Sequence, residues 1–195
     1  TAAVILQINS PGGSPVQSAD IYDEIKRLRQ KYEDIPLYAV VSDMAASGGY
    51  FVAAAADKIY ANKSSLVGSI GVRMDGFGLV EMIEKIGIER RLLTAGEHKG
   101  LLDPFLPANQ KQQLHIQKML NQVHQHFIEA VKNGRGDRLV ESPELFSGLV
   151  WSGEEALGMG LIDAFGSTKS VARDVVKQDE IVDFTSKELL LDRLA

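Results

Sequence analysis

Two mostly apolar runs, each followed within about six residues by a glycine-rich turn, constrain the fold of this chain most strongly. Residues 4–8 and residues 37–41 have the composition of strands that are buried on both faces of a parallel sheet. The first run leads into Pro-Gly-Gly at residues 11–13, and the second leads into Ser-Gly-Gly at residues 47–49. Apolar residues at helical spacing follow the first turn. We therefore expect a repeated strand–turn–helix arrangement.

The rest of the chain continues this alternation. Helices are expected over about residues 15–32, 45–56, 79–86, 108–133, 153–159 and 167–177, and further strands at residues 58–60, 68–72, 88–94, 149–151 and 161–164. We predict an α/β protein with a parallel sheet, in which residues 1–195 form a single domain with helices at its C-terminal end. Because the first strand begins almost at Thr1, we also expect the full-length protein to have residues upstream, where any membrane anchor would lie.

Composition excludes several classes of function. The 195 residues include no cysteine, so thiol catalysis, disulfides and zinc–thiolate sites are ruled out. The net charge of −5, with no basic block, argues against nucleic acid as a partner. No apolar run approaches the roughly 18 residues that a membrane-spanning helix needs.

Ser47 stands between residues with almost no side chain, in Met-Ala-Ala-Ser-Gly-Gly-Tyr at residues 44–50. Small neighbours leave the hydroxyl open to a substrate and the nearby backbone N–H groups unshielded. Ser47 is therefore a candidate nucleophile, and the N–H of Gly48 is a candidate donor to an oxyanion. The alternative interpretation is that Ser47 only caps the expected helix or packs closely against a neighbour.

The turn at residues 11–13 offers a second backbone donor. It follows a strand, and the carboxyl ends of parallel strands meet at one edge of a sheet, where ligands bind. A plain strand-to-helix turn would also explain Pro-Gly-Gly. Two glycine turns at the same edge favour an acyl-transfer site instead.

A serine nucleophile needs a base, and the residues alone leave that base open. His98 in a polar loop would need an orienting carboxylate, which no particular residue supplies. Lys99 would act as a neutral amine and would need no third residue to set a tautomer. The other histidines, His115, His124 and His126, fall on the longest expected helix and are predicted to be solvated or to cap it.

An ordered set of motifs then resembles a known family, the bacterial signal peptide peptidases of the SppA type, which are serine–lysine peptidases. The resemblance spans roughly residues 4–165. It is carried by residues 9–13 (Asn-Ser-Pro-Gly-Gly), 44–50, 55–59 (Ala-Ala-Asp-Lys-Ile), 68–72 (Gly-Ser-Ile-Gly-Val), 94–99 (Thr-Ala-Gly-Glu-His-Lys), 134–136 (Gly-Arg-Gly) and 150–156 (Val-Trp-Ser-Gly-Glu-Glu-Ala).

The resemblance implies a role for five residues. Ser47 would be the nucleophile, Lys99 the general base, and the N–H groups of Gly13 and Gly48 the oxyanion hole. Ser69 would hydrogen-bond the lysine amine and orient it. No cofactor and no metal are implied. The implied fold is the ClpP/crotonase-like spiral of ββα units, in a single peptidase domain.

The resemblance also implies substrates, partners and a location. The substrates would be cleaved signal peptides and other short apolar peptides. The chains would form a homo-oligomeric ring or dome, in which the serine and lysine of one site can come from adjacent protomers. The enzyme would work at the bacterial cell membrane, on the periplasmic or extracytoplasmic side, through an anchor absent from this chain.

Three other functions remain open from the sequence. A phage-type capsid or scaffold protease of the same superfamily would use the same dyad. A crotonase-like acyl-CoA enzyme would also direct glycine N–H groups at an oxyanion, although Ser47 would then have no role. An inactive oligomeric scaffold would keep the fold without the chemistry.

Overall fold

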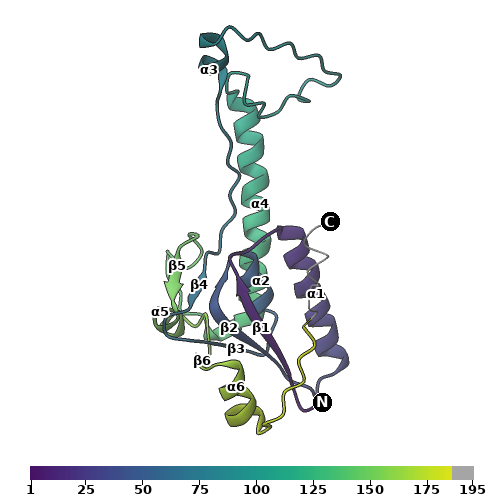
Figure 1. The fold of residues 1–195 in the computed structure, drawn as a ribbon, viewed down its shortest axis with the longest axis vertical. Coiled ribbons are helices and arrows are strands. Elements are labelled where there is room, and N and C mark those ends of the chain that lie inside the picture. Colours follow the sequence, from purple (N-terminus) through teal and green to yellow (C-terminus); the bar gives the residue numbers. More distant parts are fainter. Residues whose placement is uncertain (186–195) are drawn as a thin grey trace.

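A six-stranded sheet built around the long strand β2 (Leu37–Ala46) organises residues 1–185, which the computed structural model describes (Figure 1). The first half of β2 pairs in parallel with β1 (Val4–Ser10) on one edge and with β3 (Lys58–Ala61) on the other. The end of β2 pairs in parallel with β4 (Leu66–Gly68). One central strand therefore joins both halves of the sheet.

The two remaining strands complete the sheet at its ends. The short strand β6 (Ala164–Phe165) pairs in parallel with β3, whereas β5 (Val150–Ser152) runs antiparallel to β4. The α/β class predicted from the sequence is confirmed. The expectation of a parallel sheet was wrong at β5: the chain leaves β4, passes through α3 (Val80–Lys85) and α4 (Gln110–Arg135), and returns along β4 in the opposite direction.

Three helices bury aromatic side chains against one another. Tyr22 on α1 (Pro15–Lys31) meets Phe51 on α2 (Gly48–Ala53) edge to face, with ring centroids 5.5 Å apart. Phe51 in turn stacks on Phe127 of α4 (Gln110–Arg135) at 4.8 Å. Since all three rings are buried, this row fixes α2 between the two longer helices.

The first half of α4 projects from the sheet together with residues 74–109, which include α3 (Val80–Lys85) (Figure 1). We call residues 74–120 the distal arm. Its apolar side chains are unusually open to solvent, with Phe77 84% exposed and Leu93 98% exposed. The strand expected over residues 88–94 was wrong: this segment forms no strand, since it lies on the arm, away from the sheet.

The C-terminal part returns to the sheet through short elements. It comprises a 3₁₀ turn (Gly136–Arg138), α5 (Gly153–Gly158), α6 (Thr168–Ser170) and a π-helical turn (Val171–Val176). The helix expected over residues 167–177 is thus divided in two. Among residues 1–185, no helix combines the length and the apolar character needed to cross a bilayer.

Asp163 ties the end of α4 to the sheet. Its carboxylate accepts hydrogen bonds from the guanidinium of Arg135 at 2.8 Å, from that of Arg138 at 3.2 Å and from the backbone N–H of Ile59 at 2.6 Å. Burial raises the pKa of the Asp163 carboxyl, but the hydrogen bonds and the two positive charges outweigh burial and hold this pKa below its usual value. Arg135 is itself only 1% exposed, so its charge depends on Asp163 for compensation.

Replacing Asp163 by Asn is expected to lower the free energy of unfolding by about 3 kcal/mol at pH 7, because it leaves the buried Arg135 charge unpaired. A carboxylate whose pKa is lower in the folded state than in the unfolded state stabilises the fold at pH values above its unfolded-state pKa. This contribution disappears as the pH falls through the folded-state pKa. The difference between D163N and the original protein should therefore shrink below about pH 4. Urea unfolding measures both effects. Asp174→Asn, which breaks the exposed pair with Arg173, should change the urea midpoint far less.

Candidate active site

Ser47 occupies a sharp turn between β2, which ends at Ala46, and α2, which begins at Gly48. Its backbone has φ 51° and ψ −121°, a conformation that a residue with a side chain rarely adopts. Its N–H donates to the carbonyl oxygen of Gly68 at 2.8 Å, which fixes the turn to β4. Within residues 1–185 the Ser47 hydroxyl has no hydrogen-bond partner, so the serine does not cap α2 through its side chain. The hydroxyl is available to a ligand.

The glycine turn after β1 packs directly on this serine. Gly12 has φ +118°, and a Cβ atom there would lie 2.8 Å from the Ser47 Cβ and 3.1 Å from the Gly48 nitrogen. A Cβ on Gly48 would in turn lie 3.1 Å from the Gly13 nitrogen and would collide with the Ser18 hydroxyl. Only glycine fits at Gly12 and Gly48 without movement of their neighbours. The two turns are in contact, as expected for the carboxyl ends of neighbouring parallel strands.

The backbone N–H groups of Gly13 and Gly48 are both unused. Among the described residues neither donates a hydrogen bond to a protein acceptor. Gly48 is the first residue of α2, so its N–H has no acceptor within the helix. Two free donors beside one free hydroxyl form the arrangement that stabilises a tetrahedral oxyanion.

Ser47, Gly13 and Gly48 line one cavity of about 810 Å³. Its other lining residues come from the start of α1, from α2 and α4, and from the loops after β4 and before β5: Pro11, Gly12, Pro15, Ser18, Phe51, Ser69, Gly71, Val72, Arg73, Val123, Phe127, Ser147 and Gly148. Arg73 is the one ionisable side chain in this lining. Because a guanidinium stays protonated, residues 1–185 place no base for the serine in the lining of this cavity.

Ser69 reaches the cavity from the end of β4. It has φ 52°, and its N–H donates to the carbonyl oxygen of Leu149 at 2.7 Å. The segment 68–72 is therefore a strand only up to Gly68 and then turns along the cavity. His124 on α4 holds this segment, since its Nε2 lies 3.0 Å from the carbonyl oxygen of Ile70. The prediction that His124 is solvated or caps the helix was wrong, whereas His115 and His126 are exposed.

Lys99 and His98 lie on the distal arm, away from this cavity. The Lys99 side chain is exposed, and its backbone N–H donates to Gly96. His98 is also exposed and approaches only the carboxylate of Glu97, at 4.0 Å. Within one chain, the structure brings Ser47, Gly13, Gly48 and Ser69 together and leaves both candidate bases elsewhere.

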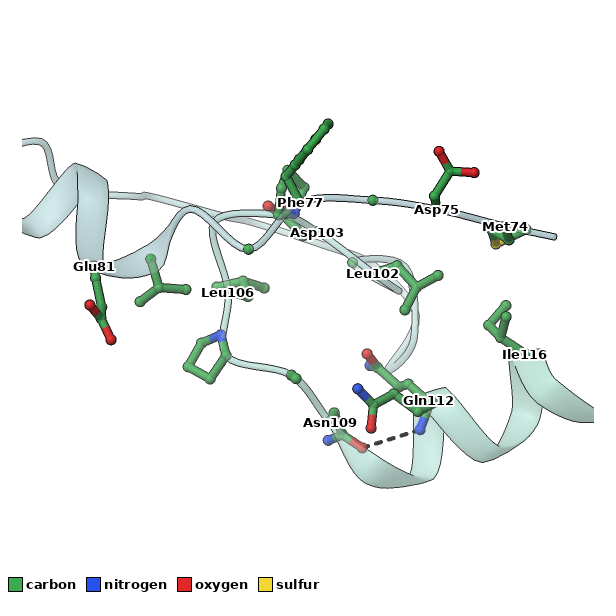
Figure 2. Close-up of a pocket in the computed structure, with 18 of the residues that line it drawn as sticks. Met74, Asp75, Phe77, Glu81, Leu102, Asp103, Leu106, Asn109, Gln112 and Ile116 are labelled. Carbon is green, nitrogen blue, oxygen red and sulfur yellow. Dashed lines mark hydrogen bonds between the residues drawn. The ribbon is translucent and has the colours of Figure 1, made fainter.

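A second, larger cavity of about 1390 Å³ lies within the distal arm, between residues 74–108 and the first half of α4 (Figure 2). Gly100, the neighbour of Lys99, lines it together with Gln112 and Ile116 of α4. Lys99 itself lines neither cavity, and the segment that carries it lies on the part of the molecule that projects away from the sheet (Figure 1).

Two serines whose roles were not predicted from the sequence support the glycine turns. The Ser10 hydroxyl accepts a hydrogen bond from the Gly12 N–H at 3.1 Å. The Ser18 hydroxyl donates to the carbonyl oxygen of Ser14 at 3.0 Å and lies against Gly48. Ser10 belongs to the Ser-Pro-Gly-Gly run and was open to detection as a turn-forming hydroxyl, whereas only the tertiary structure shows that Ser18 meets Gly48.

Comparison with known proteins places the chain among peptidases. The family described as "Peptidase family S49" matches residues 29–182, which make up most of the chain. A protein of Enterococcus faecium named as a signal peptide peptidase SppA is 31% identical over 93% of this chain and 52% of its own length. "Serine protease SPPA, chloroplastic" of Arabidopsis thaliana is 35% identical over 97% of this chain and 28% of its own length.

A relative with a different name also matches. "Na(+)/H(+) antiporter NhaA" of Brucella abortus is 46% identical over 88% of this chain, but the match covers only 23% of that protein. The transport activity in this name is that of the whole antiporter, most of which lies outside the matched region. The chain spans between 23% and 52% of the length of these three relatives.

Proposed function

The chain belongs to peptidase family S49, and from this premise we propose that it is a serine endopeptidase in which Ser47 is the nucleophile and Lys99 the general base. One observation carries the proposal: the Ser47 hydroxyl, on a strained turn, lies beside the backbone N–H groups of Gly13 and Gly48, and none of the three has a hydrogen-bond partner among residues 1–185. The crotonase-like alternative would leave Ser47 without a role.

The proposed reaction begins when the neutral Lys99 amine removes the Ser47 proton as the hydroxyl oxygen attacks a peptide carbonyl carbon. The N–H groups of Gly13 and Gly48 donate to the resulting oxyanion, and each such donor typically contributes about 10²–10³ in rate. Protonated Lys99 then donates its proton to the leaving amine. Water, deprotonated by the same lysine, releases the acyl product and restores the serine.

We propose that Lys99 reaches Ser47 from a second copy of the chain. Among the described residues, none that lines the Ser47 cavity is a base, while Lys99 is exposed on a projecting arm that also exposes apolar side chains such as Phe77 and Leu93. A ring or dome of protomers would cover this apolar surface and complete each site with a neighbour's lysine. In that assembly Ser69, already at the cavity, would hydrogen-bond the incoming amine.

The proposed substrates are cleaved signal peptides and other short, extended apolar peptides. The peptide would bind by strand addition beside Gly12 and Gly13, with side chains entering the cavity toward Val123 and Phe127. The name of the Enterococcus faecium relative supports this substrate class. We propose that the enzyme acts at the bacterial membrane, on its extracytoplasmic side, held there by a segment outside this chain.

The pH dependence of peptide cleavage tests the choice of base. A lysine acts as a base only when its amine is neutral, so kcat/KM should rise toward alkaline pH. The assay compares the original protein with His98→Ala, and both should show the same rising profile. If kcat/KM instead rose with a midpoint near pH 6.5, and this rise disappeared in H98A, His98 would be the base.

A further inference from the structure

Ser10 is placed to control one of the two oxyanion donors, although it does not line the Ser47 cavity. Its hydroxyl accepts a hydrogen bond from the N–H of Gly12 at 3.1 Å, in the loop that carries the Gly13 N–H. Gly12, at φ +118°, is held on its other side by contact with Ser47 and Gly48. The loop is thus fixed between the nucleophile turn and the Ser10 hydroxyl.

Ser10 is itself fixed to the elements that carry the nucleophile. It is the last residue of β1 and, after an irregularity in the register, pairs with Ala45 of β2, two residues before Ser47. On the side of α2, a Cβ on Gly49 would lie only 3.0 Å from the Ser10 carbonyl oxygen and 3.1 Å from its Cβ. Ser10 therefore cannot shift without moving β2 or α2.

We propose that Ser10 is a positioning residue for the reaction: its hydroxyl couples the Gly12–Gly13 loop to β2 and α2, so that the Gly13 N–H stays aligned with the oxyanion formed at Ser47. This inference rests on the proposed function. It gives Ser10 a role distinct from substrate binding, because the hydroxyl acts on the loop and not on the peptide. Its loss should therefore affect the transition state more than the bound substrate.

The test compares Ser10→Ala with Ser10→Thr, which keeps the hydroxyl. S10A should lower kcat by about 10- to 100-fold with KM changed by less than about twofold, since misplacing one donor forfeits part of its contribution. S10T should recover most of kcat. The matched control is Ser142→Ala, because the Ser142 hydroxyl also accepts from the N–H two residues ahead, at Glu144, but lies outside the cavity. S142A should keep the original kcat.

Hydrogen exchange of the backbone amides provides a readout that does not depend on activity. In S10A the Gly12 amide loses its acceptor, so exchange within residues 12–14 should accelerate by about fivefold or more, while the thermal midpoint shows that the protein is folded. Unchanged kcat in S10A, or an equal loss in S10A and S10T, would overturn the positioning role. If the original protein cleaved no peptide, the proposed function would be wrong. If hydrogen exchange were unchanged in S10A, the claim that the Ser10 hydroxyl fixes the Gly12–Gly13 loop would be wrong, whatever the activity.

Discussion

Replacing Ser47 by Ala is expected to lower kcat/KM for peptide cleavage by about 10⁴-fold or more, because no other group can form the acyl intermediate. The Ser47 hydroxyl makes no hydrogen bond within the described chain, so its removal should leave the fold intact. A fluorophosphonate reagent should label the original protein at Ser47 and should not label S47A. Mass spectrometry of the labelled peptide identifies the residue.

The matched control for this prediction is Ser64→Ala, which removes an exposed serine hydroxyl from a turn outside the Ser47 cavity. S64A should keep full activity and full labelling. If S47A cleaved peptide at the original rate, the nucleophile would be misassigned. If the original protein neither cleaved peptide nor reacted with the reagent, the chain would be an inactive scaffold.

Replacing Lys99 by Ala is expected to reduce activity about as strongly as S47A, since the serine then lacks its base. The more informative experiment mixes the two inactive variants under conditions that allow subunits to exchange. In a ring in which each site takes Ser47 from one copy and Lys99 from the next, a random equal mixture should restore about one quarter of the sites. Peptide cleavage by the mixture, against each variant alone, measures this recovery.

The mixing experiment separates two arrangements of the dyad. A site built within one chain would give no activity in the mixture, because every copy lacks either the serine or the lysine. Lys63→Ala is the matched control: it removes another exposed lysine, which lies outside the Ser47 cavity and pairs with Glu154. K63A should remain active alone. Lys63 should not be needed for recovery, so a mixture of S47A and K99A that also carry Lys63→Ala should recover as much activity as the original mixture.

Local sequence patterns predicted much of the fold because they act over a few residues. The apolar run at β1 and the helix α1 are nearly where expected, and α4 begins and ends within two residues of its predicted bounds. The ClpP/crotonase-like fold, implied by the resemblance, is confirmed by membership of family S49. Residues 88–94 were misread as a strand because their composition cannot show that no neighbouring strand is available for pairing.

The groups that form the nucleophile turn could be predicted from the sequence alone, because Ser47 and its glycines act through local backbone conformation and small size. Ser47 lies in the turn directly before α2, and Gly12 lies in another turn that follows a strand. The three-dimensional fold brings these two turns into contact, sets Ser10 and Ser18 against them, and leaves Lys99 outside the cavity that Ser47 lines. Contacts between distant residues depend on the path of β2 and the length of α4, which no short pattern encodes.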